Sequence, residues 1–406
     1  MVIMYKTIFR PAEILLPDYS VNDERWQKWS VIACDQFTSQ IEYWNEAEKI
    51  VGDDASCLKM VLPEAYLETE RADAQREVIK ASMKALPKAL KKYDNALIYL
   101  ERTLPDGKIR RGVVGKVDLA EYDFSADSKS AVRATEATVI ERIPPRVAVR
   151  READIELPHV MLFSDDRERT VFNYLDSVKE NLAKLYDFEL MLGGGHAVGY
   201  LICGEYLDAV MKLYEAYEES KTGAIVYSVG DGNHSLATAK THYEELKAKS
   251  GDELGDHPAR YALVEVVDLG DEAIEFEPIY RLLKNVDIEH FFGVLPAEGH
   301  AVPAYFANGE KTVYFADNGG LPLDSMQKTI DKYISEHPEV KCDYIHGLDD
   351  CIALGREEKS LALICTGIEK EELFDAVGTG GALPRKTFSM GEAKSKRYYI
   401  EAREII

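Results

Sequence analysis

The sequence predicts a mixed α/β fold, because segments with strand patterns alternate with segments with helix patterns over most of its length. In the middle, the apolar run AIVYSV (224–229) leads into a glycine-rich turn and a helical pattern, and a second apolar run, YALVEVVDL (261–269), follows. Strand, tight turn, helix and strand in this order form a βαβ-like unit. The C-terminal third repeats the alternation in the segments 311–316, 324–337, 342–347, 360–368 and 370–381.

The N-terminal half contains one predicted helix and one predicted hairpin. Residues 62–93 are rich in Ala, Glu, Lys and Leu, which predicts a helix that Pro87 should kink or divide. Residues 96–119 contain two β-like runs around Pro105-Asp106-Gly107. Because Pro, Asp and Gly favour tight turns, these runs predict two strands joined by a turn.

Two further helices and a glycine-rich turn are predicted before the central unit. In 170–188 and 204–220, apolar residues recur every three or four positions, which predicts amphipathic helices. The run LGGGHAVGYLICG (192–204) lacks the strand, the spacing and the downstream acid of a dinucleotide-binding turn. It therefore predicts a β-hairpin or turn, with His196 near a ligand as an open alternative.

The length of the chain sets its organisation. At 406 residues the chain exceeds one ordinary core, and about two to three domains are expected. We expect an N-terminal α/β region at 1–130, a central region with the glycine turn at 131–290, and a C-terminal α/β region at 291–406. The last boundary is soft and lies near Asp287 to His300, because no break in composition marks it.

Charge and cysteine content restrict the partners and the compartment. The formal net charge of −23 argues against a nucleic-acid or anionic-membrane binder, including a partition-type DNA binder, although a local basic pocket stays compatible with it. Six scattered cysteines without a zinc-like spacing indicate free thiols in a reducing compartment. With no signal-like start and no run of roughly 18 apolar residues, we expect a cytoplasmic protein. A homo-oligomer is left open.

The turn Gly230 to Ser235 (GDGNHS) is the leading candidate site. Glycines before a helix expose backbone N–H groups at the positive end of the helix dipole, which suits a phosphate. Gly230 and Gly232 permit the turn, and Asn233 or Ser235 can cap the helix. Asp231 can hold a metal or accept a proton, and His234 can donate one. Alternatively, these are ordinary residues of a helix start, without a catalytic role.

A second candidate is the arginine-rich segment 129–152, which supplies positive charge in an acidic chain. Five arginines there, with Glu136 and Glu141 among them, would attract an anionic ligand: Arg133, Arg142, Arg146, Arg150 and Arg151. The alternative is that these arginines pair with surface carboxylates.

Three other segments contain residues that can contribute to a site. The run GTGGALPRKT (378–387) is not a P-loop, because Pro384 and Arg385 precede Lys386 where a glycine is required, yet Lys386 can still contact a phosphate. Asp35 and Gln36 follow an apolar run and can face a pocket at a strand end. His159 and His257 lack partners at helical spacing, so no zinc site is expected.

Four segments, in the same order, resemble the bacterial and archaeal family called domain of unknown function 1015. These segments are DGNHS with the helix LATAKTHYEEL, RATEATVIERIPPRVAVR, FEPIYRLL and LPRKTFSMGEAKSKRYY. The turn is also similar to that of the ParB and sulfiredoxin superfamily, which includes a free serine kinase. The resemblance implies a ParB/sulfiredoxin-like core around Asp231-Gly232-Asn233-His234, with additional α/β regions.

The resemblance further implies nucleotide-dependent phosphoryl chemistry on a small polar metabolite. Arg133, Arg281 and Lys386 would clamp phosphate, Glu136 would act as base or metal ligand, and Asp231 with Glu136 would hold Mg²⁺ beside ATP or ADP. The turn would form the phosphate cradle, and Asp231, His234, Glu136 and Arg133 are expected to share one pocket.

The sequence also departs from the family pattern. Asn233 and Ser235 replace a commoner His and Arg, and Ser235 cannot neutralise a phosphate as an arginine does. Similarly, Thr135 stands where a His is usual before Glu136, and Tyr280 stands where a His is usual before Arg281. The alternative to an enzyme is therefore a non-catalytic protein that senses a nucleotide or anion.

Overall fold

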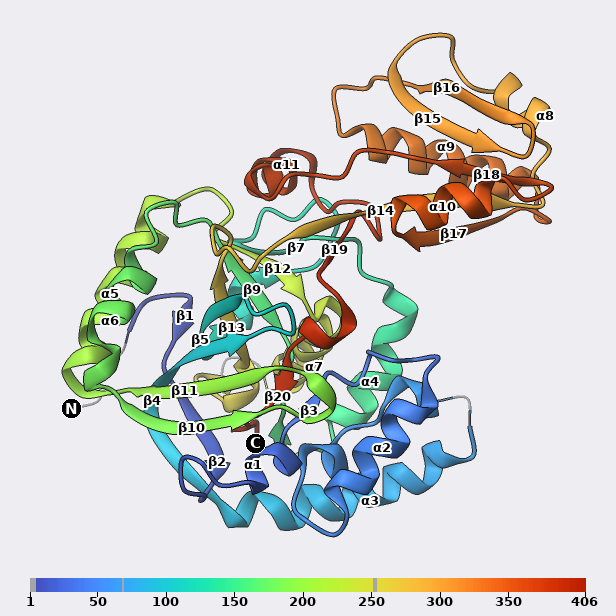
Figure 1. The fold of residues 1–406 in the computed structure, drawn as a ribbon. Helices are drawn as coiled ribbons and strands as arrows, with labels where there is room; N and C mark the ends of the chain where they lie inside the picture. The colour runs from blue at the N-terminus through green and yellow to red at the C-terminus, as the bar shows by residue number, and fades with distance from the viewer. Residues whose placement is uncertain (1–4, 68, 251–253) are drawn as a thin grey trace. The chain divides into compact units, whose positions relative to one another are not determined.

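The structure is a computed structural model, which describes residues 5–67, 69–250 and 254–406 (Figure 1). The chain divides into two compact units, each assembled from separate segments. The first comprises Met1–Ala134, Thr138–Ile274 and Glu392–Ile406, and the second comprises Thr135–Ala137 and Glu275–Gly391. The main transition between them, at Ile274 and Glu275, comes before the soft boundary expected near Asp287 to His300.

The first unit contains a mixed sheet of 11 strands in its described part. Its main order is β10 (Ala183–Glu189), β11 (His196–Ile202), β4 (Leu90–Thr103), β5 (Ile109–Asp118), β13 (Tyr261–Asp268), β9 (Met161–Ser164), β12 (Tyr227–Asp231), β7 (Val132–Ala134) and β6 (Tyr122–Asp123). In addition, β1 (Phe9–Arg10) pairs with β5 and β2 (Ala12–Pro17) pairs with β4. Parallel pairs join β13 to β9, β12 to β7 and β7 to β6, whereas the other pairs are antiparallel. The mixed α/β fold class is confirmed.

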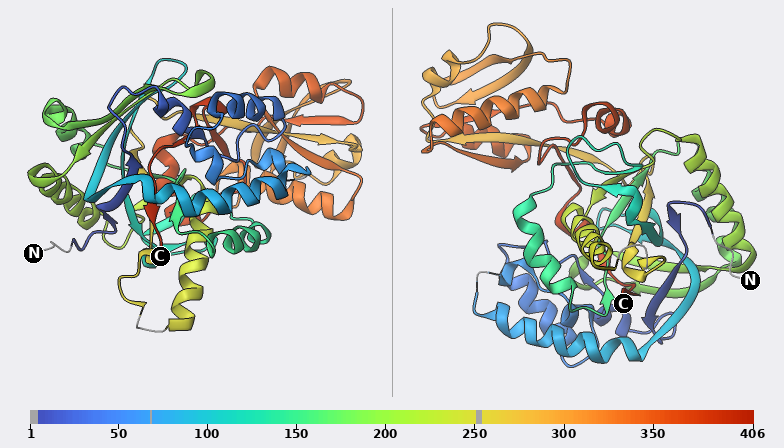
Figure 2. Two further views of the ribbon diagram at one scale, coloured as in Figure 1. Left: turned by 90° about the horizontal axis from the view of Figure 1, so that it is seen from below. Right: turned by 180° about the vertical axis from the view of Figure 1, so that it is seen from behind.

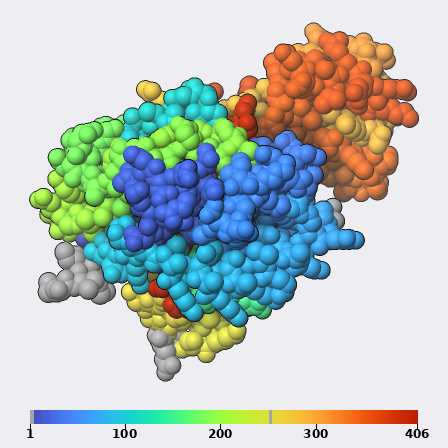
Figure 3. Space-filling view, turned by 60° about the horizontal axis from the view of Figure 1, so that its bottom comes forward, coloured from blue at the N-terminus to red at the C-terminus, as the bar shows by residue number. Residues whose placement is uncertain are grey.

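Both faces of this sheet are buried, because alternate side chains of a strand point to opposite faces. In β4, Ile98 and Leu100 pack into one core cluster, whereas Leu97 and Tyr99 pack into the other. The first cluster includes α1 (Arg25–Trp29) and α2 (Ile41–Val51), which are seen in blue in Figure 3. The second includes α5 (Thr170–Val178), α6 (Gly204–Ser220) and α7 (Asn233–Ser250), which Figure 2 shows from two further directions.

The central strand–helix–strand order is confirmed, but its geometry differs from a parallel βαβ unit. The elements β12, α7 and β13 follow one another as expected. However, β9 lies between the two strands, antiparallel to β12 and parallel to β13. The two strands that flank α7 in sequence are therefore antiparallel to each other.

Tertiary pairing overrides the expected helices in two places. The helix predicted over 62–93 is confined to η2 (Glu64–Tyr66), α3 (Arg71–Ala85) and η3 (Leu86–Ala89), with Pro87 dividing it as expected. From Leu90 onward the chain enters β4, which pairs with three other strands. The helix predicted over 170–188 is wrong in its second half, because α5 and η6 (Lys179–Asn181) lead into β10.

The remaining first-unit predictions agree with the structure. The hairpin of β4 and β5 turns at Pro105-Asp106-Gly107, and the helix over 204–220 is α6. The glycine-rich run 192–204 contains part of the turn after β10 and then β11, which pairs with β10 as a hairpin. The short elements η7 (Met191–Gly193) and η4 (Leu119–Glu121) occupy turns of this unit.

The C-terminal segment returns to the first unit after the chain has formed the second. There, β20 (Tyr398–Tyr399) pairs with β3 (Val31–Ile32), and β21 (Arg403–Glu404) pairs with β8 (Ile155–Glu156). These two short ladders fix residues 392–406 against two separate segments of the first unit.

The second unit has its own sheet, ordered β16 (Gly309–Phe315), β15 (His300–Phe306), β18 (Ser360–Leu363), β14 (Phe276–Lys284) and β17 (Lys341–His346), with β19 (Phe388–Met390) beside β14. Leu283 of β14 packs with α8 (Ile288–Gly293) and α9 (Pro322–Glu336). Its neighbour Leu282 packs on the opposite face with α10 (Leu348–Gly355). The unit also contains α11 (Leu373–Gly380) and η10 (Lys370–Glu372).

Candidate functional site

The glycine turn lies where β12 ends and α7 begins. Gly232 has a φ of 79°, and a Cβ at this position would lie 3.0 Å from the Val160 Cα. A Cβ on Gly230 would lie 2.5 Å from a ring carbon of Phe163. Both positions therefore require glycine, one for its conformation and its close approach and the other for space. The predicted strand–turn–helix context of this motif is present.

The first turn of α7 presents backbone N–H groups at the positive end of a long helix. The Leu236 N–H donates to the Gly232 carbonyl at 3.0 Å, which closes the first turn. Helix geometry leaves the N–H groups before that bond outside the intrahelical ladder. In addition, the side-chain oxygen Oδ1 of Asn233 is buried without a hydrogen-bond partner. A buried unpaired acceptor at this place indicates a site that is completed by another group.

Asp231 forms an ion pair beside this helix start. Its Oδ1 accepts a hydrogen bond from the Gly232 N–H at 2.8 Å, and its Oδ2 lies 3.4 Å from the Lys396 Nζ. The side chains of Lys396 and Asp231 are only 15% and 18% exposed. Consequently, a partly desolvated cation and a carboxylate meet at the positive end of the α7 dipole.

A second carboxylate, Asp35, lies near the same lysine. It follows β3, and its Oδ2 is 3.9 Å from the His159 Nε2. Burial opposes ionisation of Asp35, but His159, a hydrogen bond from Gln36 and the charge of Lys396 together lower its pKa below the usual value. Asp35 is therefore ionised at neutral pH and can accept a proton or attract a cation.

Tyr399 links His159 to Cys34 at the end of β3. Its hydroxyl lies 3.0 Å from the His159 Nδ1 and 3.2 Å from the Cys34 Sγ, and it accepts the Cys34 N–H. Burial, with the nearby charge of Asp35, raises the pKa of the Cys34 thiol to about 12. Cys34 is thus a protonated neighbour and not a nucleophile. The hydroxyl of Tyr399 orients the His159 ring toward Asp35.

His234 and Arg133 belong to the same unit but make structural contacts. The His234 Nε2 accepts the Val139 N–H at 3.2 Å, so this nitrogen is unprotonated in the observed arrangement. Arg133 lies opposite Ser228 in the parallel β7–β12 register, which places it beside the strand that carries Asp231. Its side chain is buried, its Nε donates to the Ser130 carbonyl at 2.8 Å, and burial lowers its pKa.

Glu136, Arg281 and Lys386 meet in the second unit. The Glu136 carboxylate accepts the N–H groups of Lys386 and Thr387, both at 3.2 Å. Lys386 has a φ of 60°, uncommon for a residue with a side chain, and consecutive N–H groups in such a turn form a nest for an anion. Burial raises the pKa of Glu136, although these N–H groups oppose the shift.

Arg281 supports this nest from inside the second unit. Its side chain is fully buried, and its guanidinium donates to the carbonyls of Ile279, Arg385 and Lys386 and to Gln327 Oε1. Because these bonds occupy most of its donors, the observed role of Arg281 is to hold the 385–387 loop. Of the residues expected to share one site, Asp231, His234 and Arg133 belong to the first unit, and Glu136, Arg281 and Lys386 belong to the second.

Two residues of the Asp231 site were missed by sequence reasoning. Lys396 lies in the C-terminal segment that resembles the family, but within that segment only Lys386 was assigned a role, and only the pairing of β20 with β3 brings Lys396 back to Asp231. His159 was considered solely as a zinc ligand, and its contact with Asp35 depends on the tertiary fold. By contrast, the position of Asp35 after an apolar run predicts from the sequence that it can face a pocket.

The described residues contain no group of three or more His, Cys, Asp or Glu side chains arranged to hold a metal ion. Mg²⁺ commonly takes one or two carboxylates and completes its shell with water and substrate phosphates. Asp231 and Asp35 fit that second mode, whereas they do not form a metal cage by themselves. Likewise, none of the described helices is long and apolar enough to cross a membrane.

The chain belongs to the family described as protein of unknown function (DUF1015), whose model matches residues 15–340. No curated protein matches it. Among solved structures, it is similar to a conserved hypothetical protein from Pyrococcus furiosus, with 12% identity, 68% of this chain and 90% of that chain covered, and a TM-score of 0.36.

Two structures of free serine kinase variants are similar at the same level. The complex with AMP has 12% identity, 74% and 94% coverage of this chain and that chain, and a TM-score of 0.40. The complex with ADP has 11% identity, 73% and 92% coverage, and a TM-score of 0.39.

Proposed function

We propose that the protein is a nucleotide-dependent phosphotransferase or phosphohydrolase that acts on a small polar metabolite, in the manner of a free serine kinase. The observation that supports the proposal is the ion pair of Lys396 and Asp231 at the glycine turn that opens α7. A lysine, a close backbone approach at Gly232 and a helix N-terminus together favour a phosphate group. The nucleotide is ATP or ADP with Mg²⁺.

The phosphate would bind over the first turn of α7. There the N–H groups before Leu236 and the Lys396 ammonium offer positive charge in a partly desolvated place. Gly232 lets the backbone approach the ligand closely. The unpartnered Oδ1 of Asn233 is an acceptor, so it would accept from a hydroxyl or amine of the ligand and not from the phosphate. Ser235, on the next position of the helix, adds a hydroxyl but no charge.

Asp35 and Asp231 would have different roles in the reaction. Asp35, ionised and oriented by His159, would accept the proton of an acceptor hydroxyl while a new P–O bond forms and the bond to the nucleotide breaks. Asp231 would position Lys396 and hold Mg²⁺ together with the phosphates. When bound, that ion would neutralise negative charge on the phosphates. His234 would fix the neighbouring loop through Val139. Glu136, Arg133, Arg281 and Lys386 stay candidates whose observed contacts are structural.

The experiment is a turnover screen on the purified full chain with ATP, ADP, CTP and pyrophosphate. Each donor is combined with small hydroxyl acceptors, including free serine, and product is followed by phosphorus NMR. Turnover should appear with at least one pair and should fall by about 10²-fold or more in Asp35→Asn and Asp231→Asn.

Lys394→Ala is the matched control, because it removes a lysine two positions from Lys396 and should leave turnover unchanged. Nucleotide binding without turnover for every acceptor would indicate the sensing alternative. Absence of binding for all four donors would overturn the proposal.

A further inference from the structure

Lys396 lies in a part of the chain with little regular structure. It follows the single turn η11 (Ala393–Ser395) and comes two residues before β20. Its side chain is nevertheless only 15% exposed and is paired with Asp231. A lysine side chain loses much rotamer freedom when it is held in one geometry, so the main chain beneath it has to be fixed by other contacts.

Two buried arginines hold the main chain directly before Lys396. The Arg102 Nη2 donates to the Lys394 carbonyl at 3.1 Å, and the Arg110 Nη1 donates to the Ser395 carbonyl at 2.9 Å. Arg102 and Arg110 are only 2% and 4% exposed. These two residues, the buried arginine pair, therefore fix two consecutive carbonyls at the approach to the lysine.

The buried arginine pair costs stability. Arg102 of β4 lies directly opposite Arg110 of β5 in the antiparallel register. Like charges in opposite positions repel each other, and the repulsion is stronger away from water. Burial, with the charge of Arg110, lowers the pKa of Arg102 to about 9, so Arg102 is still charged at neutral pH. Because apolar side chains at these positions would avoid this cost, the stability of the sheet does not account for the pair.

Glu265 connects the buried arginine pair to the residue after Lys396. It belongs to β13 and is fully buried, and its carboxylate oxygens lie 3.7 Å from the Arg110 Nε and 2.8 Å from the Arg397 Nε. A Cβ on Gly112 of β5 would collide with this carboxylate, so the glycine provides the space that the carboxylate occupies. The contacts before and after Lys396 thus belong to one buried network.

We propose that the buried arginine pair and Glu265 are positioning residues for Lys396. They hold the main chain on both sides of this lysine, so that its ammonium stays beside Asp231. None of the three touches the ligand, and each acts through Lys396. This role rests on the proposed function as far as ligand binding is concerned, whereas the position of Lys396 can be measured without a ligand.

The first test measures the position of Lys396 in the absence of a ligand. Lysine amines are modified with acetic anhydride, and mass spectrometry compares the rate at Lys396 with the rate at the exposed Lys394. In the parent protein, Lys396 should react more slowly, because its side chain is mostly buried and paired. Arg110→Gln should raise the ratio of the two rates about tenfold, the factor that corresponds to the loss of a hydrogen bond to a charged group.

An unchanged rate ratio in folded Arg110→Gln would overturn the positioning role. Glu265→Gln provides the same test if Arg110→Gln does not fold, because it keeps the size of the side chain and removes its charge. It should also raise the ratio, and circular dichroism verifies the fold of each variant.

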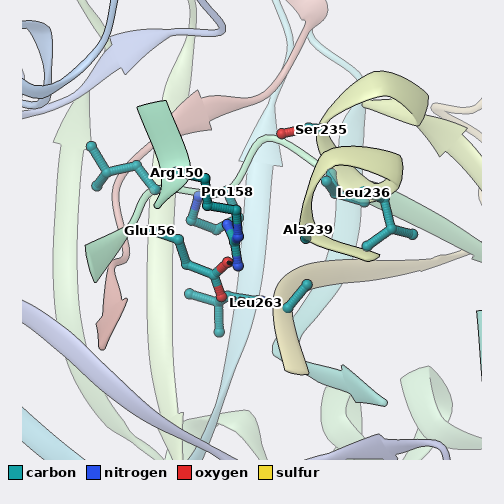
Figure 4. Close-up of a pocket in the computed structure, with 10 residues that line it drawn as sticks. Arg150, Glu156, Pro158, Ser235, Leu236, Ala239 and Leu263 are labelled. Carbon is teal, nitrogen blue, oxygen red and sulfur yellow. Dashed lines mark hydrogen bonds and ion pairs between the residues drawn. The ribbon is translucent and has the colours of Figure 1, made fainter. Parts of the chain in front are cut away.

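Arg403→Gln is the matched control, since Arg403 is another buried arginine that holds the same C-terminal segment. Its guanidinium donates to the carbonyls of Pro258 and Tyr261 and to the Glu156 carboxylate. Glu156 lies at the opposite end of a small pocket from Ser235, so these contacts lie away from the glycine turn (Figure 4). The control should leave the rate ratio unchanged. Equal increases in both variants would show a general loosening of the segment and would contradict a specific positioning role.

The second test is calorimetry with ADP, which detects whether Arg110 acts through Lys396. Arg110→Gln and Lys396→Ala should each weaken ADP binding about tenfold, and the double variant should show no further loss. A role of Arg110 in the fold alone would instead give additive losses of about a hundredfold in the double variant, which would overturn the inference. Absence of ADP binding in the parent protein would refute the proposed function, and the rate ratio would then decide the positioning role by itself.

Discussion

The Lys396 Nζ lies 3.4 Å from the Asp231 Oδ2, although the second unit separates these residues along the chain. The pair forms because residues 392–406 return to the first unit and β20 is fixed against β3. It brings a cation to the start of α7, where the helix dipole alone would favour an anion. The turn therefore combines a lysine and a helix N-terminus, each of which favours an anion.

Replacement of Lys396 should weaken nucleotide binding and abolish turnover. Without the ammonium, the phosphate of the proposed site would lose the lysine that pairs with Asp231, and the Asp231 carboxylate would repel it. We expect about tenfold weaker ADP binding for Lys396→Ala by calorimetry, and a loss of about 10²-fold or more in kcat/KM. Lys394→Ala should behave like the parent protein. An unchanged ADP affinity in Lys396→Ala would contradict the placement of phosphate beside this lysine.

A side chain at Gly232 should lower the free energy of unfolding through two effects, the strain of a positive φ and the close contact with Val160. Gly232 and Gly223 have nearly equal φ values of 79° and 80°, but a Cβ on Gly223 meets nothing within 4 Å. Alanine at Gly223 should cost about 1 kcal/mol of unfolding free energy, whereas alanine at Gly232 should cost about 1 kcal/mol more. Chemical denaturation measures both, and equal losses would show that Val160 yields to the added methyl group.

The larger substitution Gly232→Val should abolish nucleotide binding in a folded sample. A β-branched side chain disfavours a positive φ and blocks the backbone face over which the phosphate would lie. Calorimetry with ADP is the measurement, and circular dichroism verifies the fold. Binding at parental affinity would reduce the turn to a structural helix start.

The stability of the first unit should decrease as Asp268 ionises. Burial raises the pKa of Asp268 to about 6, although N–H groups of Gly270 and Asp166 counteract part of the shift. For a carboxyl with a raised folded pKa, the stabilising contribution is complete below the unfolded pKa near 4 and is lost as pH rises through about 6.

Comparison of the parent with Asp268→Asn isolates this effect. Between pH 4.5 and 7.5, the parent should lose about 2 kcal/mol relative to the variant, since the amide does not titrate. Denaturant unfolding at both pH values measures the difference. A constant difference across this interval would mean that Asp268 ionises normally in the folded protein.

Two of the thiols, those of Cys203 and Cys34, should react at very different rates. Cys203 is exposed, whereas Cys34 is partly buried and burial raises its pKa to about 12. The thiolate is the reactive form of a cysteine. Because the pKa of Cys34 rises from 9.0 to about 12, the thiolate fraction at neutral pH falls by roughly a thousandfold. Alkylation followed by mass spectrometry should find Cys203 modified first. Faster labelling of Cys34 would contradict its protonated state.

Local patterns were sufficient for elements whose own residues decide their structure. Helix α6 and strand β13 lie where the apolar periodicity places them, and Pro105-Asp106-Gly107 forms the expected hairpin turn. By contrast, Ala183–Glu189 carries a helix-like composition but becomes a strand because β11 pairs with it. The pairing partner cannot be predicted from the residues of 183–189 and their neighbours in the sequence.

The same distinction applies to the site. Asp231 and Gly232 can be predicted from the sequence because they form a turn between a strand and a helix, which is a local pattern. Lys396 and His159 become neighbours of Asp231 and Asp35 only through the β3–β20 ladder and the loop after β8. The separate contacts of Glu136 also depend on a long-range feature, the nest at Lys386 and Thr387.

The return of residues 392–406 to the first unit has a consequence for biosynthesis. Lys396 and Tyr399 leave the ribosome after the entire segment Glu275–Gly391, which takes roughly ten seconds to translate at typical rates. Until then the nascent first unit lacks β20 and β21, and Asp231 has no lysine beside it. The pair of Asp231 and Lys396 would therefore be assembled last, so that a chain released early from the ribosome lacks the lysine of the proposed site.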